Sequence, residues 1–424
     1  MLQNLLFRAL IAYTWLLAMF IDPSAAETIR ENNPALYAIT VMPAVAFILA
    51  SFMDFLRLRF DKPAIALLLL IAGSAVIAVM RGDLATLISV GSLCAMLVAI
   101  RQTRVRMSVG FANALFFLSI VTAEIMFILG VARYGAFPGQ VANDMVAWRA
   151  SLFAYSVTPS WLFSLVIIGL NYFHNRQRGP RIVMMTLGLY FLIFSASRTG
   201  IIVLLLCAGF LACTRLIRFR DRLFYRLFTP LAVIMFVVIL NAEQLLLLLT
   251  GVDNPLVNAV LFKTTEGVAS IDQASTSIIR TFIWAQHMQI FSENPLMGAG
   301  TFNLLDTAPE FEMVASTGSE SFLTALLARV GMIAAFFVYF MHLLSVDASR
   351  RSDRLAYCLT ILFAISTLAY GSYIVPYDFV FLALFGAMNS GRPLREDSPS
   401  VTHANAAFER DTRGDIASES PHGG

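Results

Sequence analysis

The sequence has few charged residues. Asp, Glu, Lys and Arg make up only 13% of its 424 residues, whereas hydrophobic residues make up 58%. Soluble domains usually carry about 25% charged residues, so this composition excludes an ordinary water-soluble domain. The net charge is only +3, and we expect no nucleic-acid partner.

Cysteine and the common catalytic motifs are also scarce or absent. The spacing of the cysteines indicates neither a disulfide framework nor a CxxC metal site. The sequence has no GxxxxGK[ST], HExxH, GxSxG or DxD motif, which are signatures of nucleotide, zinc, serine-hydrolase and metal–nucleotide-sugar chemistry. We therefore expect no metal, no cofactor and a membrane-borne donor for any reaction. The four cysteines all lie in apolar runs: Cys94, Cys207, Cys213 and Cys358.

Long apolar runs are what the sequence has in abundance. A helix satisfies its own backbone hydrogen bonds in hydrocarbon and needs about 20 apolar residues to cross it. The sequence therefore predicts an all-α integral membrane protein with about twelve transmembrane helices. The first run also fits a cleaved signal peptide. The runs are residues 5–21, 35–55, 64–80, 84–100, 108–131, 156–173, 182–197, 200–214, 227–250, 321–345, 355–372 and 375–390.

Basic residues alternate between the connections. Cytoplasmic loops are enriched in Lys and Arg, so the connections with most of them should lie inside and both termini in the cytoplasm. The inner set is Arg57, Arg59, Lys62, Arg101, Arg104, Arg106, Arg176, Arg178, Arg181, Arg215, Arg218, Arg220, Arg222, Arg226, Arg350, Arg351 and Arg354. The outer set is Arg30, Arg81, Arg133, Arg149, Lys263 and Arg280.

Two outer connections are long, residues 132–155 and 251–320, and long ordered loops often carry function. We expect residues 1–391 to form one polytopic membrane domain. Residues 392–424 are rich in Ser, Pro, Gly and charge, which predicts a disordered cytoplasmic tail.

A short outer connection, Ser197-Arg198-Thr199-Gly200, carries an arginine between two spans. Arg198 has two interpretations. It can be an interfacial side chain that reaches the headgroups, or an anion ligand at a helix end, suited to phosphate.

Residues 275–293 are predicted to form an amphipathic helix along the membrane surface within the large outer loop. Arg280, Trp284 and His287 lie on one face of it, because they are spaced i, i+4 and i+7. An arginine beside a tryptophan is also typical of an aromatic belt, and His287 is expected to be a surface histidine rather than a base. The apolar positions are Ile279, Phe282, Ile283 and Phe291.

The helix is followed by the turn sequence Asn-Pro-Leu-Met-Gly-Ala-Gly, in which Gly298 and Gly300 permit tight turning or close backbone approach. Ser319, Glu320 and Ser321 then open the next span. A carboxylate there has two interpretations. It can be a helix cap without a catalytic role, stabilised by the helix dipole, or it can take part in the reaction. Glu124 lies inside a span toward its outer end, and we predict that it lines an outward cavity.

Taken in order, Ser197-Arg198-Thr199-Gly200, Arg280 with Trp284, the turn that ends at Gly300, and Ser319-Glu320-Ser321 leading to Gly331 resemble the superfamily of O-antigen ligases and Wzy-type polymerases. The resemblance covers about residues 180–345. It implies a metal-independent, GT-C-like glycosyltransferase that acts on undecaprenyl-diphosphate-linked oligosaccharides at the periplasmic face of the bacterial inner membrane. Membrane lipids, a flippase and a chain-length regulator of the same pathway are the other partners it implies.

By this resemblance Arg198 and Arg280 hold the lipid diphosphate, and Glu320 is the candidate base. Trp284, Gly298, Gly300, Ser319, Ser321 and Glu124 are the further substrate-binding candidates. Ligases usually carry a His-Asn pair about eleven residues before a Gly, whereas this sequence has Glu320-Ser321 before Gly331. A Ser-Glu-Ser stretch is more like the polymerases.

Two other functions stay open at this stage. A ligase would transfer a finished glycan to lipid A core or another acceptor and would use the same arginines. A polysaccharide or lipid transporter is the alternative without catalysis, although the sequence shows no two matching halves of the kind many transporters have.

Overall fold

The computed structural model describes ten parts of the chain. The chain divides into the units Met1–Ser390 and Gly391–Gly424, and all described residues belong to the first. The predicted boundary between membrane domain and tail stays a prediction. The described ranges are residues 2–20, 45–49, 60–103, 105–137, 149–155, 158–195, 197–216, 276–302, 321–369 and 379–390.

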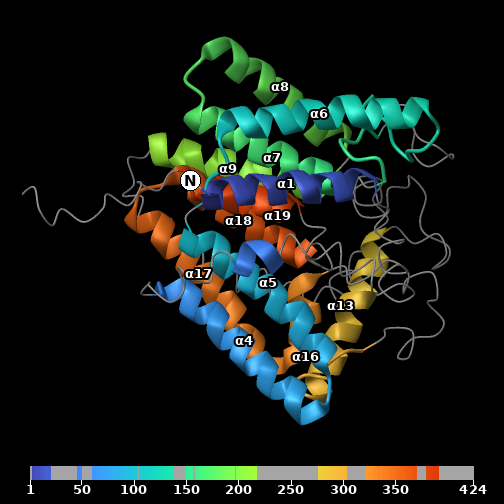
Figure 1. Ribbon diagram of the computed structural model, residues 1–424, viewed down its shortest axis with the longest axis vertical. Coiled ribbons are helices and arrows are strands. Elements are labelled where there is room, and N and C mark those ends of the chain that lie inside the picture. Colours follow the sequence, from blue (N-terminus) through green and yellow to red (C-terminus); the bar gives the residue numbers. More distant parts are fainter. Residues whose placement is uncertain are drawn as a thin grey trace, which may run out of the picture. The chain divides into compact units, whose positions relative to one another are not determined.

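Every element of regular structure in these ranges is a helix (Figure 1). Most of the apolar runs coincide with one of them, but residues 35–55 and 227–250 lie wholly or largely outside the described residues. The elements are α1 (Leu2–Phe20), α4 (Lys62–Arg81), α5 (Leu84–Thr103), α6 (Val109–Ile128), α7 (Thr158–His174), α8 (Arg178–Phe194), α9 (Arg198–Leu216), α13 (Thr276–Glu293), α16 (Phe322–Val330), the 3₁₀ turn η3 (Gly331–Ala334), α17 (Ala335–Arg350), α18 (Arg354–Ala369) and α19 (Phe379–Met388).

Five helices in the described parts are long and apolar enough to cross a membrane. This confirms the prediction of a helical membrane protein, while the number of twelve spans and the GT-C-like arrangement stay predictions. Three further apolar helices are shorter: Thr199–Ala212, Arg354–Leu368 and Phe379–Met388. The five are Gln3–Phe20, Lys62–Arg81, Thr86–Thr103, Val109–Ile128 and Phe322–Arg350.

The bounds of α4 follow from its sequence. Asp61 is the N-cap, and its carboxylate accepts a hydrogen bond of 3.0 Å from the backbone N–H of Ala64, which satisfies a donor left open at the helix start. Pro63 lies in the first turn, where its missing N–H costs nothing. Gly82 ends the helix in the left-handed conformation, with φ +66°, a common way to stop a helix.

The helix ends predicted to lie inside the cell meet one another. The side chain of Arg101, at the end of α5, contacts Asp61 at 2.6 Å and Asp347 near the end of α17 at 2.9 Å. The side-chain amide of Asn389, after α19, donates to the carbonyls of Ile100 and Val105. These contacts join the ends of four helices at one side of the bundle.

The ends predicted to lie outside also meet one another. Arg81, at the end of α4, bonds to the turn after α13, and the N–H of Ala150 donates to the carbonyl of Phe194 at the end of α8. The described ends therefore sort into the two sets that the basic residues predict. Which set faces the cytoplasm stays a prediction.

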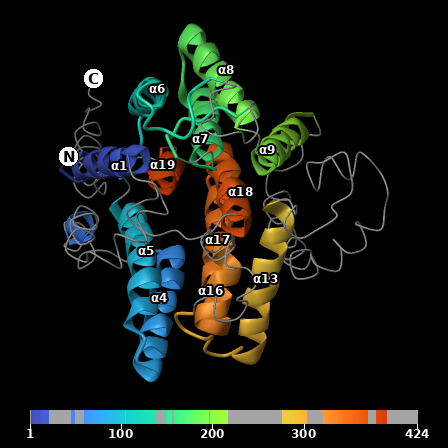
Figure 2. The same ribbon diagram turned by 90° about the vertical axis from the view of Figure 1, so that its right-hand side faces the viewer.

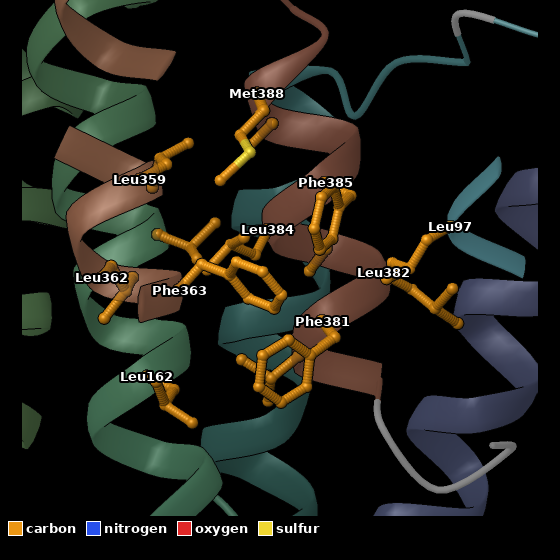
Figure 3. Packing of buried hydrophobic residues seen from close by; sticks show 14 of the residues in the cluster. Leu97, Leu162, Leu359, Leu362, Phe363, Phe381, Leu382, Leu384, Phe385 and Met388 are labelled. Carbon is orange, nitrogen blue, oxygen red and sulfur yellow. The ribbon is translucent and has the colours of Figure 1, made fainter. Parts of the chain in front are cut away.

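Leucine side chains and phenylalanine rings fill the space between α18, α19 and their neighbours (Figure 3). The ring centroid of Phe363 lies 4.9 Å from that of Phe385 and 5.7 Å from that of Phe381. Lipid tails are as apolar as these side chains, so close packing and dispersion rather than release of water hold such helices together.

Candidate functional site

Helix α13 packs lengthwise against α16 (Figure 2). Its buried side chains Ile283, His287 and Ile290 are spaced by four and three residues and so form one face. The predicted helix at residues 275–293 is confirmed. The interpretation of His287 as a surface histidine is wrong, because α16 covers this face and the side chain is fully buried.

The turn after α13 folds back onto the end of α16. Gly298 and Gly300 have φ angles of +66° and +79°, which residues with a Cβ rarely adopt. The N–H of Ala299 donates to the carbonyl of Ala328 at 2.7 Å, and the N–H of Gly300 donates to that of Arg329 at 3.0 Å. The predicted tight turn with close backbone approach is confirmed.

The α4–α5 connection holds this turn from a second side. The guanidinium of Arg81 donates to the carbonyl of Ala299 at 3.2 Å and to the side-chain oxygen of Asn294 at 3.1 Å. The carboxylate of Asp83 accepts from the backbone N–H of Thr301 and, at 2.9 Å, from its hydroxyl. Both residues were missed as site residues, although an Arg-Gly-Asp sequence between two apolar runs is the signal that could have found them.

The hydrogen bonds to Asp83 change its acidity. Burial alone would raise the pKa of this carboxyl, but the donors of Thr86 and Thr301 together outweigh burial and lower the pKa below its ordinary value. The charged form of Asp83 is thus the form that holds the turn.

His287 is the buried centre of a small cluster. Its Nδ1 lies 2.9 Å from the hydroxyl oxygen of Thr324 on α16, and its ring packs edge-on against Phe302 at 5.5 Å. The guanidinium carbon of Arg329 lies 5.8 Å from the centroid of the same Phe302 ring. Burial, and then the charge of Arg329, lower the pKa of His287 to about 3, so the imidazole stays neutral at physiological pH.

Ser321 is the N-cap of α16. It is fully buried, and its hydroxyl accepts a hydrogen bond of 3.4 Å from the N–H of Thr324. The hydroxyl of Thr324 in turn donates to the carbonyl of Ser321 at 3.3 Å. Ser321 therefore has a capping role. Glu320, bonded to it, lies outside the described residues, as does Ser319.

The predicted arginines are described only by their backbones. Arg198 begins α9, and Arg280 lies in α13 one turn before Trp284; the side chains of both arginines lie outside the described residues. Trp284 is partly buried, and its indole Nε1 has no hydrogen-bond partner among the described residues. The structure thus joins Trp284, Gly298, Gly300 and Ser321 to one unit, the α13–α16 pair, in which the two helices run parallel and the turn after α13 packs on the end of α16.

Glu124 belongs to another set of contacts. Its carboxylate accepts a hydrogen bond of 3.1 Å from the N–H of Ala136, and the hydroxyl of Tyr190 donates to the carbonyl of Ala136 at 3.4 Å. Glu124 therefore anchors the loop after α6. Its role in lining an outward cavity stays a prediction.

The apolar helices and the polar contacts of the α13–α16 pair at one side of the bundle define a helical membrane protein. Residues 183–339 match the family model described as O-Antigen ligase. This confirms the resemblance to the superfamily of O-antigen ligases and polymerases over that segment, which is less than half of the chain and contains every candidate site residue except Glu124. None of the proteins with curated function matches the chain.

Proposed function

We propose that the protein polymerises undecaprenyl-diphosphate-linked oligosaccharide repeat units into a surface polysaccharide, O-antigen or exopolysaccharide, at the periplasmic face of the inner membrane. The family match at residues 183–339 carries this proposal. The Ser-Glu-Ser stretch that ends at the N-cap of α16 favours a polymerase over a ligase.

In this proposal the leaving group is a lipid diphosphate, which gains negative charge as the anomeric carbon–oxygen bond breaks. Guanidinium groups stabilise such charge well, because they present several donors and stay protonated. Arg198 and Arg280 are the candidates for this role, and Trp284, one turn after Arg280, is the candidate for contact with the glycan.

The acceptor hydroxyl must lose its proton as its oxygen attacks the anomeric carbon. Glu320 is the proposed general base. It directly precedes the N-cap Ser321, and a helix N-terminus favours the charged form of a carboxylate, which is the form that can accept a proton. Displacement in one step inverts the anomeric carbon and requires no metal. A product with retained configuration would contradict it.

The test is glycan chain length in a host that supplies the matching repeat unit and lacks its own polymerase. Wild type is compared with Arg198→Ala, Arg280→Ala and Glu320→Gln at equal abundance in the membrane. Arg178→Ala is the matched control, because this exposed arginine begins α8 at the end predicted to be cytoplasmic.

Wild type and Arg178→Ala should build long chains, whereas the three site variants should stop at single repeats. Normal polymerisation by the site variants would show that these residues are not the site. Failure of wild type to lengthen any chain would overturn the polymerase proposal.

The second candidate is a ligase, which the description of the matching family favours. Purified protein in proteoliposomes, given a lipid-linked glycan together with either a second lipid-linked repeat or lipid A core, distinguishes the two by the acceptor that is consumed. Movement of the lipid-linked glycan across the bilayer without any transfer would instead indicate a transporter.

A further inference from the structure

His287 is an unusual residue to bury. Its side chain has no exposed surface, although a buried polar group costs free energy unless it is hydrogen-bonded. Its Nδ1 has a partner in Thr324 at 2.9 Å, whereas its Nε2 has none among the described residues. A buried histidine with this cost is easier to explain if the one hydrogen bond that it makes has a structural or functional role.

The hydrogen bonds around Thr324 assign the tautomer of His287. The hydroxyl of Thr324 donates its one proton to the carbonyl of Ser321 at 3.3 Å. The Nδ1 of His287 must then carry the proton that it shares with Thr324, an assignment made from the network. A chain of two hydrogen bonds thus runs from His287 through Thr324 to Ser321, the N-cap of α16.

The α13–α16 pair is thus held at two places. The glycine turn joins the C-terminal ends of α13 and α16 through the bonds of Ala299 and Gly300, and the His287–Thr324 bond joins the helices near the start of α16. Arg280 lies seven residues before His287 on α13, about 10 Å along the helix. Glu320 lies one residue before Ser321.

We propose that His287 is a positioning residue: its bond to Thr324 holds the start of α16, and with it Glu320, in register with the helix that carries Arg280. This inference rests on the proposed function. His287 does not touch the reacting atoms and transfers no proton. Its role is to keep the proposed base and the proposed diphosphate ligand at a constant separation.

The variants that test it follow from the geometry. Asn places its amide nitrogen near the position of a histidine Nδ1, whereas Gln places it nearer to Nε2. His287→Asn should therefore keep the bond to Thr324, and His287→Gln and His287→Leu should lose it. Thr324→Ser keeps the hydroxyl, and Thr324→Val removes it at nearly constant volume. Asn171→Leu is the control, because it breaks a buried amide pair with Asn113 elsewhere in the bundle.

The assay is repeat-unit addition in proteoliposomes, with kcat and KM measured beside thermal stability. For His287→Leu and Thr324→Val we expect kcat to fall on the order of 10- to 100-fold, as for a catalytic group displaced by about 1 Å, with KM nearly unchanged. The double variant His287→Leu/Thr324→Val should lose no more kcat than either single variant. His287→Asn and Thr324→Ser should restore most of kcat, and Asn171→Leu should lower stability with little loss of kcat.

Three results would overturn the positioning role while leaving the proposed function intact. The first is a wild-type kcat in His287→Leu, and the second is a kcat as low in His287→Asn as in His287→Leu. The third is a loss of kcat in the double variant His287→Leu/Thr324→Val that equals the sum of the two single losses in free energy. A wild type that never adds a repeat unit overturns the proposed function, and this role with it.

Discussion

The backbone nitrogen of Gly298 occupies the space that a side chain at Gly331 would need. A Cβ added to Gly331 would lie 2.6 Å from that nitrogen, and a Cβ added to Gly298 would lie 2.3 Å from the carbonyl carbon of Arg329. Both glycines have positive φ angles, +66° and +61°. Two segments more than thirty residues apart therefore interlock through backbone alone, and this contact joins the C-terminal ends of the α13–α16 pair that carries the proposed site.

The interlock predicts that alanine is poorly tolerated at both positions. Gly298→Ala and Gly331→Ala must bear a backbone with positive φ, about 1–3 kcal/mol, and a clash with backbone that cannot rotate away, about 1–3 kcal/mol more. Gly82→Ala is the matched control, since Gly82 has the same φ of +66° but open space around it. Thermal unfolding of the purified protein measures the difference. A Gly298→Ala variant as stable as Gly82→Ala would contradict the interlock.

Much of the fold could be predicted from the sequence, because apolar runs report directly on helices that must satisfy their own backbone in lipid. The turn after α13 was also predictable, since Pro and two glycines follow the helical pattern. The partners of the turn were not. Arg81 and Asp83 reach it from more than two hundred residues away, and local spacing says nothing about such contacts.

His287 shows a second limit of the sequence. Spacing groups it with Arg280 and Trp284, yet helical faces overlap, and the same residue also falls on a face with Ile283 and Ile290. Only the contact with α16 decides which face is buried. The polar partner on α16, Thr324, lies 37 residues away, so no local pattern could have revealed the pair.

Asp83 should make the stability of the protein depend on pH. Its pKa is lower in the folded protein than its ordinary value, so its contribution is present above the unfolded pKa of about 3.9 and is lost as the pH falls through the folded pKa. When the pH is lowered below about 4, the melting temperature of Asp83→Asn should therefore fall by less than that of wild type. Glu293→Gln, at an exposed carboxylate, is the control. Equal acid sensitivity in Asp83→Asn and wild type would exclude this contribution.

Arg101 should matter more for stability than Arg351, although both contact Asp347. The Arg101 side chain is 7% exposed and that of Arg351 is 24% exposed, so water replaces the lost partner more easily at Arg351. We expect Arg101→Met to cost about 1–3 kcal/mol and Arg351→Met about 0–1 kcal/mol. Thermal unfolding of both variants in one detergent tests this, and a larger loss in Arg351→Met would show that burial does not control the strength of this network.

The two sets of helix ends should lie on opposite sides of the membrane. The loop after α6 meets the end of α8, while the end of α5 meets the end of α17, and the basic residues place the second set inside. In a background without the four cysteines, a membrane-impermeant maleimide should label Val131→Cys in intact cells and Gln177→Cys only after the membrane is opened. Both positions are exposed, so access to the reagent does not depend on burial.

The reverse labelling pattern would invert the topology and place the α13–α16 pair in the cytoplasm. A lipid-linked repeat unit at the periplasmic face could not then reach Arg280 or Glu320, and the proposed polymerase would fail on geometry alone. Labelling of both positions in intact cells would mean that α7 (Thr158–His174), the one helix that the structure describes between them, does not cross the membrane. The pair Val131→Cys and Gln177→Cys therefore tests the proposed side of the reaction independently of any assay of activity.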